Sequence, residues 1–341
     1  MKRTALLLAS VVAMAVPDSA LWAEEKADAP RTLGSIERLD PRLDELIPRA
    51  AQIEVLADGF EWSEGPVWNR QDGYLLFSDI PNNVINQWSP GNGISKFLYP
   101  AGYTGPSDDY SKEPGSNGLA FDERGRLILC QHGDRRLARL ELDKSFTTLA
   151  DQYQGKRLNS PNDLAQKSDG SIYFTDPPYG LPQGADDPSR ELDFCGVYRL
   201  SPDGEVTLLT KEMTRPNGVA FSPDEKTLYV AQSDPKAAVV QAFDVQPDGT
   251  LANSRVFFDA TKMVGKAKGL PDGLKIDAHG NLFATGPGGV LVIAPDGAHL
   301  GTIRTGQATA NCAFGDDGRT LYMTADMLLL RVKLSTQGAR Y

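Results

Sequence analysis

The stretch Asn217-Gly218-Val219-Ala220-Phe221 decides the fold, because its pattern recurs along the whole chain. It begins with a polar residue and a glycine, and it continues as a short apolar strand. The turn Pro223-Asp224-Glu225 and a second apolar run, Leu228–Val230, follow it. Turn residues of this kind between two apolar runs are typical of a β-hairpin. Five further copies of the pattern begin at Glu64, Asn117, Asn162, Asp272 and Ala310.

The copies begin roughly 40 to 55 residues apart, a spacing typical of the four-stranded blades of a β-propeller. The remainder of each repeat supplies an outer pair of strands, such as Gly196–Leu200 and Val206–Leu209. The last repeat has room for only three strands, so we expect Ile53–Leu56 to complete its blade and close the ring. The repeats therefore predict an all-β protein with a single six-bladed β-propeller domain over residues 51–341.

The first 23 residues have the features of a secretory signal peptide. Lys2 and Arg3 precede an apolar stretch over residues 5–16, and Leu21-Trp22-Ala23 is an acceptable cleavage site. A hydrophobic first helix of the fold is the alternative. We expect the leader to be removed, residues 24–50 to form an N-terminal extension, and the mature protein to be exported, periplasmic or secreted, without membrane insertion.

The composition excludes some classes of partner. The chain has 341 residues, a formal net charge of −10, 33 Gly and 23 Pro. An acidic protein offers no electrostatic footprint for phosphate backbones, so we expect no nucleic-acid partner. Cys130, Cys195 and Cys312 form an odd set without a CxxC pair, which permits one disulfide at most. Cys130 and Cys312 lie in apolar strand patterns, and we favour the interpretation that they are small buried residues. The oligomeric state is left open.

The polar residue that begins each repeat is a candidate metal ligand. The innermost strands of a propeller line its central channel, so residues that begin those strands converge on one mouth. Carboxylate and amide oxygens favour a hard cation such as Ca²⁺ or Mg²⁺ over zinc. The alternative is that Asn-Gly and Asp-Gly are only turn dipeptides. Asn311 lies one position late in its repeat and is not counted among these candidates, which are Glu64, Asn117, Asn162, Asn217 and Asp272.

Several motifs together resemble the SMP-30/gluconolactonase/luciferin-regenerating-enzyme family, and the likeness covers about residues 50–335. The motifs are Trp62-Ser63-Glu64-Gly65-Pro66-Val67-Trp68, Ser160-Pro161-Asn162-Asp163, Arg215-Pro216-Asn217-Gly218-Val219-Ala220-Phe221-Ser222 and Pro271-Asp272-Gly273-Leu274. The resemblance implies a six-bladed propeller with one central divalent ion, usually Ca²⁺, with Mg²⁺, Mn²⁺ and Zn²⁺ as alternatives. It also implies hydrolysis of a sugar lactone.

By this resemblance Glu64, Asn217 and Asp272 would bind the ion directly, and Asn162 would be a fourth ligand or a substrate contact. Asp272 would also be the catalytic group. Ser160 stands where some relatives have a substrate-binding arginine, so substrate choice is expected to differ.

The second strand of each hairpin runs back toward the same mouth, so its end is expected to face the ligand. We therefore predict that His132 and Asp176 contact a small lactone substrate, with a structural role as the alternative for His132. Asn117 and Asn162, which begin first strands, are further predicted contacts, and Tyr179 is either a wall for the sugar ring or a packing residue.

Our hypothesis is that the ion polarises the lactone carbonyl while water attacks it. The residues leave open whether Asp272 or a metal-bound hydroxide is the base. No Gly-x-Ser-x-Gly elbow and no dinucleotide or P-loop pattern is present. Two alternatives remain: another lactonase or organophosphate hydrolase on the same site, or a non-catalytic binding propeller braced by calcium.

Overall fold

The structure is a computed structural model that describes Met1, residues 30–107 and residues 110–339. Apart from Met1, the predicted leader over residues 1–23 lies outside the described residues. One compact unit spans Arg31–Tyr341.

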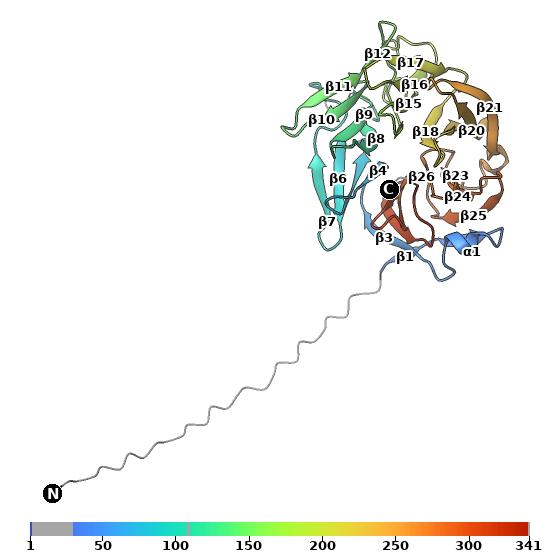
Figure 1. The fold of residues 1–341 in the computed structure, drawn as a ribbon. Coiled ribbons are helices and arrows are strands. Elements are labelled where there is room, and N and C mark those ends of the chain that lie inside the picture. The colour runs from blue at the N-terminus through green and yellow to red at the C-terminus, as the bar shows by residue number, and fades with distance from the viewer. Residues whose placement is uncertain (2–29, 108–109, 340–341) are drawn as a thin grey trace. The chain divides into compact units, whose positions relative to one another are not determined.

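Six sheets form the blades of a β-propeller, which confirms the predicted architecture (Figure 1). The first three blades, each from the inner strand outward, are β4 (Ser63–Asn69), β5 (Tyr74–Asp79), β6 (Val84–Ser89) and β7 (Gly93–Leu98); β8 (Ser116–Phe121), β9 (Leu127–Gln131), β10 (Arg136–Leu140) and β11 (Phe146–Ala150); and β14 (Leu164–Gln166), β15 (Ile172–Asp176), β16 (Gly196–Leu200) and β17 (Val206–Thr210).

The other three blades, in the same order, are β18 (Pro216–Phe221), β19 (Thr227–Asp234), β20 (Ala237–Val245) and β21 (Leu251–Asp259); β22 (Leu274–Ile276), β23 (Leu282–Gly286), β24 (Gly289–Ile293), β25 (His299–Arg304) and β2 (Ser35–Arg38); and β26 (Thr309–Gly315), β27 (Thr320–Ala325), β28 (Leu328–Lys333), β3 (Ile53–Asp58) and β1 (Thr32–Leu33). The short elements are the helix α1 (Leu43–Leu46), the hairpin β12 (Gln152–Tyr153) and β13 (Lys156–Arg157), and the 3-10 turns η1 (Gly184–Asp186) and η2 (Thr261–Met263).

Each blade is packed between two neighbours, so its middle strands are buried on both faces. All five residues of β9 and all five of β24 are buried. Strands of this kind read as continuous apolar runs rather than as alternating ones. The core is accordingly divided among the spaces between blades; for example, Leu76 and Ile85 of one blade pack with Leu119 and Leu129 of the next.

The ring closes as the repeats predicted. The strand β3 pairs antiparallel with β28, so residues 53–58 complete the last blade. Residues 31–50, which precede the predicted boundary at residue 51, belong to the same compact unit as the propeller. Strand β1 pairs with β3, strand β2 pairs with β25, and Leu43 and Ile47 are buried in the core between them. This segment was interpreted as an extension because it carries no copy of the repeat.

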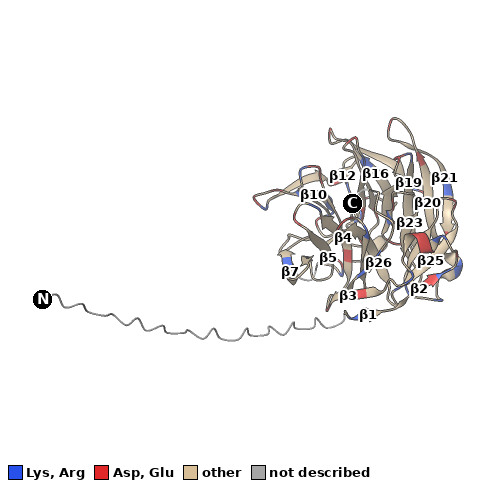
Figure 2. Ribbon diagram, turned by 60° about the horizontal axis from the view of Figure 1, so that its bottom comes forward, with Lys and Arg blue, Asp and Glu red and all other residues tan. Residues whose placement is uncertain are grey.

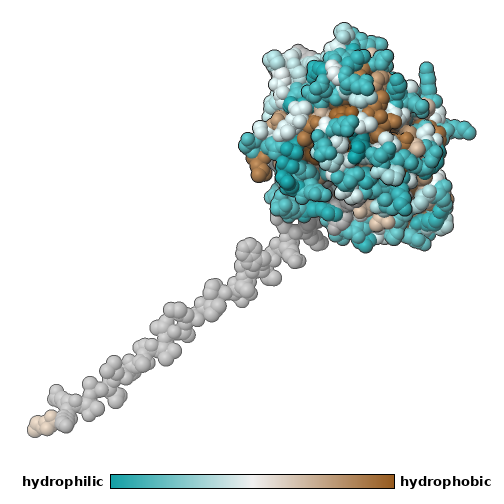
Figure 3. All heavy atoms as spheres, turned by 45° about the horizontal axis from the view of Figure 1, so that its top comes forward, coloured by the Kyte–Doolittle hydropathy of each residue, from teal (hydrophilic) through white to brown (hydrophobic). Residues whose placement is uncertain are grey.

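The three cysteines are buried and free, which confirms the interpretation favoured for Cys130 and Cys312. Among the described residues, none of the helices has the length and apolar content needed to cross a bilayer. Acidic and basic residues are dispersed over the strands and loops (Figure 2), and hydrophilic residues predominate on the face shown in Figure 3, where hydrophobic residues gather in one band.

Candidate metal centre and active site

The five polar residues that begin the repeats line one central cavity of about 360 Å³. They come from five different blades, and four of them are at most 4% exposed. The structure thus brings together all five residues that the repeat pattern singled out, which are Glu64, Asn117, Asn162, Asn217 and Asp272.

The backbone at these positions departs from regular strand pairing, and this departure turns the side chains toward the axis. The pairing register shifts between Glu64 and Val67, and equivalent shifts follow Ser116 and Pro216. In the other two blades the polar residue precedes the first paired residue of the inner strand. Bulges of this kind re-aim side chains and are frequent beside active sites.

The glycine after the polar residue is needed where neighbouring inner strands touch. A Cβ atom on Gly65 would overlap the carbonyl oxygen of Asn117, and one on Gly218 would overlap the carbonyl oxygen of Asp272. Gly65 also has a φ of +51°, which L side chains rarely adopt. The Asn-Gly and Asp-Gly pairs therefore combine a cavity-facing side chain with a close contact between blades.

Hydroxyl side chains join each blade to the next at the level of the site. Thr175 Oγ1 donates a hydrogen bond to the Asn217 carbonyl oxygen at 2.7 Å, and Ser78 Oγ donates to that of Asn117 at 2.9 Å. Ser233 Oγ donates to Pro271 O at 2.6 Å, one residue before Asp272. The positions of the cavity-facing residues are therefore set by bonds between blades as well as within them.

Burial dominates the electrostatics of the site. It raises the pKa of Glu64 to about 8, and repulsion from Asp163 and Glu113 adds to that shift. Burial also raises the pKa of Asp272 well above its ordinary value, and repulsion from Glu64 adds to that shift. Hydrogen bonds from the Gly65 backbone and the Asn217 side chain act in the opposite direction. Two desolvated carboxyls that line one cavity are costly in their ionised form unless a positive charge compensates them.

The oxygen donors of the cavity fit a hard divalent cation. Three of them have no hydrogen-bond partner among the described residues: Asn117 Oδ1, Asn162 Oδ1 and Asp272 Oδ1. Asn217 Nδ2 donates to Ser233 Oγ at 2.9 Å, which leaves the amide oxygen for the cavity. Within residues 30–107 and 110–339 no three His, Cys, Asp or Glu side chains are grouped as a metal site, because most donors here are amides.

Two of the predicted ligand contacts lie elsewhere. His132 and Asp176 are fully buried and do not line the cavity. Asp176 Oδ2 accepts a hydrogen bond from the Asn159 backbone N–H at 2.8 Å, and it thereby supports the segment that leads to Asn162. Neither side chain forms part of the cavity wall, and their contact with a ligand stays a prediction. Tyr179 does line the cavity, as expected.

The repeat pattern missed several residues that line the cavity. Glu113 and Arg215 bring charged groups to it, and Trp62 and Ser233 form part of its wall. Glu113 lies on a loop between blades and carried no sequence signal that we could use. Arg215 lies two residues before Asn217, as Ser160 does before Asn162, and that register could have identified it. Ser160 instead donates to Pro177 O and accepts from Gly180 N, on either side of Tyr179.

The fold and cavity define the class of the protein as a six-bladed β-propeller whose inner strands direct carboxyl and amide oxygens into one central pocket. Residues 62–326 match the family described as "SMP-30/Gluconolactonase/LRE-like region", and the chain belongs to this family.

Relatives and solved structures extend this likeness over nearly the whole chain. A protein named gluconolactonase from Zymomonas mobilis is 41% identical over 314 residues, which cover 90% of this chain and 88% of that protein. A solved gluconolactonase from Xanthomonas campestris has 34% identity and a TM-score of 0.77, covering 89% of this chain and 96% of its own. A calcium-binding regucalcin from Agrobacterium tumefaciens, with 19% identity and a TM-score of 0.66 over 83% of this chain and 94% of its own, shares the fold.

Proposed function

We propose that the protein hydrolyses a sugar lactone of the glucono-1,5-lactone type to the aldonic acid, with the help of one divalent cation. The observation that carries the proposal is the convergence of five oxygen-donor side chains, three with unpartnered oxygens, in one cavity. The relative named gluconolactonase, at 41% identity over 90% of the chain, supports the substrate class. A volume of about 360 Å³ suits a small ligand.

Glu64, Asn162, Asn217 and Asp272 would hold the cation, and Ca²⁺ is our first choice, with Mg²⁺, Mn²⁺ and Zn²⁺ as alternatives. When bound, the cation would supply a Lewis acid for the lactone carbonyl. A positive charge beside Asp272 favours its ionised form, which can accept a proton from the attacking water. Asn117 and Tyr179 would contact the hydroxyl groups of the sugar, and the guanidinium of Arg215 would bind the carboxylate of the product.

We also propose a partner and a location for the protein in the cell. The partner is a small molecule, with no role for nucleic acid or for membrane insertion, and the protein is exported to the periplasm or secreted after removal of residues 1–23. Amino-terminal sequencing of the mature protein would test the export step, since a chain that retains Met1 would contradict it.

The experiment that tests the function compares substrates on one preparation. Protein treated with chelator and reloaded with Ca²⁺ is assayed with glucono-1,5-lactone and with a phosphotriester, each corrected for spontaneous hydrolysis. We expect turnover of the lactone only. Turnover of the triester alone would indicate an organophosphate hydrolase, and turnover of neither, with a melting temperature that still depends on calcium, would indicate a binding propeller.

A further inference from the structure

Glu113 is a second acidic group in the cavity, outside the set of repeated residues. It lies in the connection between β7 and β8, three residues before β8 begins, and its side chain lines the same cavity as Asp272. The role proposed for the cation leaves Glu113 without a function. A partly desolvated carboxyl at a reaction centre needs an explanation, because desolvation of its charged form is costly.

The backbone beside Glu113 is held between two blades. The N–H of Gly115 donates to Ile80 O at 3.0 Å, the N–H of His132 donates to Gly115 O at 3.1 Å, and the N–H of Gly133 donates to Pro114 O at 3.2 Å. A Cβ atom on Gly115 or Gly133 would crowd these same partners. The end of the connection that carries Glu113 is therefore closely packed on both sides.

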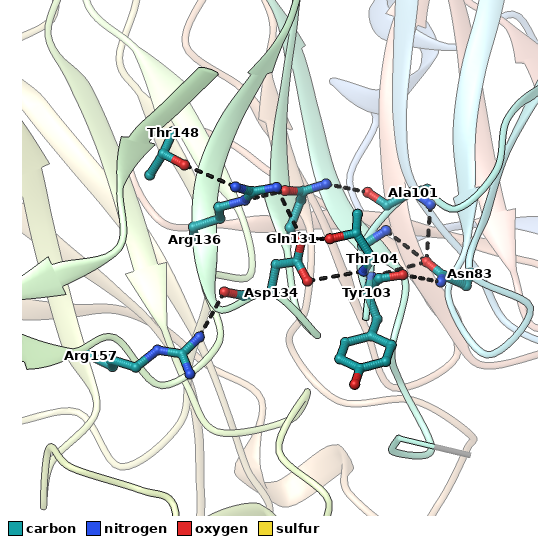
Figure 4. A network of polar contacts seen from close by, with 10 residues as sticks. Asn83, Ala101, Tyr103, Thr104, Gln131, Asp134, Arg136, Thr148 and Arg157 are labelled. Atoms are coloured by element: carbon teal, nitrogen blue, oxygen red, sulfur yellow. Dashed lines mark hydrogen bonds and ion pairs between the residues drawn. The ribbon is translucent and has the colours of Figure 1, made fainter. Parts of the chain in front are cut away.

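The other end of the same connection is fixed by the polar network in Figure 4. Asn83 Oδ1 accepts hydrogen bonds from the backbone N–H groups of Ala101, Gly102 and Tyr103 at 2.7–3.2 Å. Asp134 accepts from both the backbone N–H and the hydroxyl of Thr104. Both ends of the connection are therefore anchored, and the backbone next to Glu113 has a defined position before any ligand binds.

His132 lies behind this carboxyl. Its Nδ1 is 3.6 Å from Glu113 Oε2, its side chain is fully buried, and neither ring nitrogen has a hydrogen-bond partner among the described residues. Burial lowers the pKa of His132 to about 3, so the imidazole is neutral and supplies no positive charge to Glu113.

Glu113 can therefore carry a proton at and below neutral pH. Although 37% of its side chain is accessible, protein surrounds the carboxyl on most sides, and this desolvation raises its pKa to about 7. The other titratable or charged groups around the cavity are Glu64, Asp272, Tyr179 and Arg215. Repulsion from Glu113 in turn adds to the raised pKa of Glu64 and of Asp272.

We propose that Glu113 is a further catalytic residue, the acid that protonates the ring oxygen of the lactone as the ring opens. This inference rests on the proposed lactonase function. The oxygen of water forms a bond to the carbonyl carbon while Asp272 accepts the proton that water loses. The bond between the carbonyl carbon and the ring oxygen then breaks, its electron pair passes to the ring oxygen, and that oxygen takes the proton of Glu113. Solvent returns a proton from Asp272 to Glu113.

The geometry gives the two carboxyls different roles. Asp272 belongs to the inner-strand residues that would hold the cation, whereas Glu113 approaches the cavity from a loop and has a neutral histidine behind it. A base and an acid in one cavity require environments that separate their proton affinities. An alkoxide is a poor leaving group, so protonation of the ring oxygen would help ring opening directly.

The test replaces Glu113 by glutamine, which keeps the size of the side chain and removes its proton. In the calcium-loaded protein E113Q should lower kcat on glucono-1,5-lactone by about 10²- to 10⁴-fold, with KM and the calcium affinity unchanged. The matched control is E191Q, because Glu191 is exposed, does not line the cavity and accepts a hydrogen bond from the Arg157 backbone. This control should keep the native kcat.

A second measurement does not depend on turnover. The infrared difference spectrum between native protein and E113Q at pH 6 should contain the C=O band of a protonated carboxylic acid. A carboxylate band in its place, or an E113Q kcat within threefold of the native value, would overturn the proposal. A loss of kcat that comes with an equal loss of calcium binding would assign Glu113 a structural role instead.

Absence of activity in the native protein would overturn the lactonase function together with this inference, whereas active native protein with active E113Q overturns this inference alone.

Discussion

Replacement of His132 by glutamine should make the protein less sensitive to acid. His132 is fully buried, and its pKa is lowered to about 3 by that burial, whereas a histidine in an unfolded chain has a pKa of about 6.5. Between these two values the unfolded state binds a proton that the folded state does not bind. The contribution of His132 to stability is therefore present above about pH 6.5 and is lost as the pH falls toward 3.

The size of the effect follows from the interval that is crossed. A solution at pH 5 is about 1.5 pH units below the pKa of histidine in the unfolded chain, and each unit corresponds to about 1.4 kcal/mol of unfolding free energy. The native protein should thus lose about 2 kcal/mol of unfolding free energy through His132 between pH 7.5 and pH 5, and H132Q should not lose this amount. Any packing lost by the substitution affects both pH values equally and cancels from the comparison.

The assay is urea unfolding of native protein and H132Q at pH 7.5 and pH 5, both without calcium. The matched control is H279Q, since His279 is exposed on the turn between two inner strands. We expect H279Q to follow the native protein and H132Q to differ from it by about 2 kcal/mol in the change between the two pH values. An identical change for native protein and H132Q would refute the reasoning, because His132 would then titrate in the folded protein as it does in the unfolded chain.

Two further substitutions test the site. D272N should lower kcat on glucono-1,5-lactone by about 10²- to 10⁴-fold, because an amide cannot accept the proton of water. Steady-state kinetics with added calcium would measure this loss. Near-native turnover with the ion bound would exclude Asp272 as the base. G218A should weaken calcium binding by about 10- to 100-fold in a calorimetric titration. The added Cβ would overlap the carbonyl oxygen of Asp272 and displace that residue. An unchanged calcium affinity would contradict the role given to this contact between blades.

The sequence was most informative where one structural position occurs six times. Five of the six copies place a polar residue before an apolar inner strand, and the symmetry of a propeller then brings those positions to one axis. The cavity positions of Glu64, Asn117, Asn162, Asn217 and Asp272 could for this reason be predicted without any knowledge of distances.

Other features could not be predicted from the repeat. Glu113 reaches the cavity from a loop, and hydrogen bonds to Asn83 and Asp134 help to hold that loop. Neither of these two residues belongs to the repeated motif. His132 and Asp176 do lie at strand ends, as expected, but their side chains turn into the protein, and periodicity alone does not reveal that rotation. Residues 31–50 carry no repeat, yet their backbone pairs with the outer edges of two blades.

The most direct test of the central claim is a titration of Ca²⁺ into chelator-treated protein while glucono-1,5-lactone hydrolysis is followed in a pH-stat. If one cation held by the central residues is required for turnover, activity should rise from the spontaneous rate and reach its plateau at one equivalent of calcium per chain. Full activity in the chelated protein, or a rate that stays at the spontaneous value with Ca²⁺, Mg²⁺, Mn²⁺ and Zn²⁺ alike, would contradict the account.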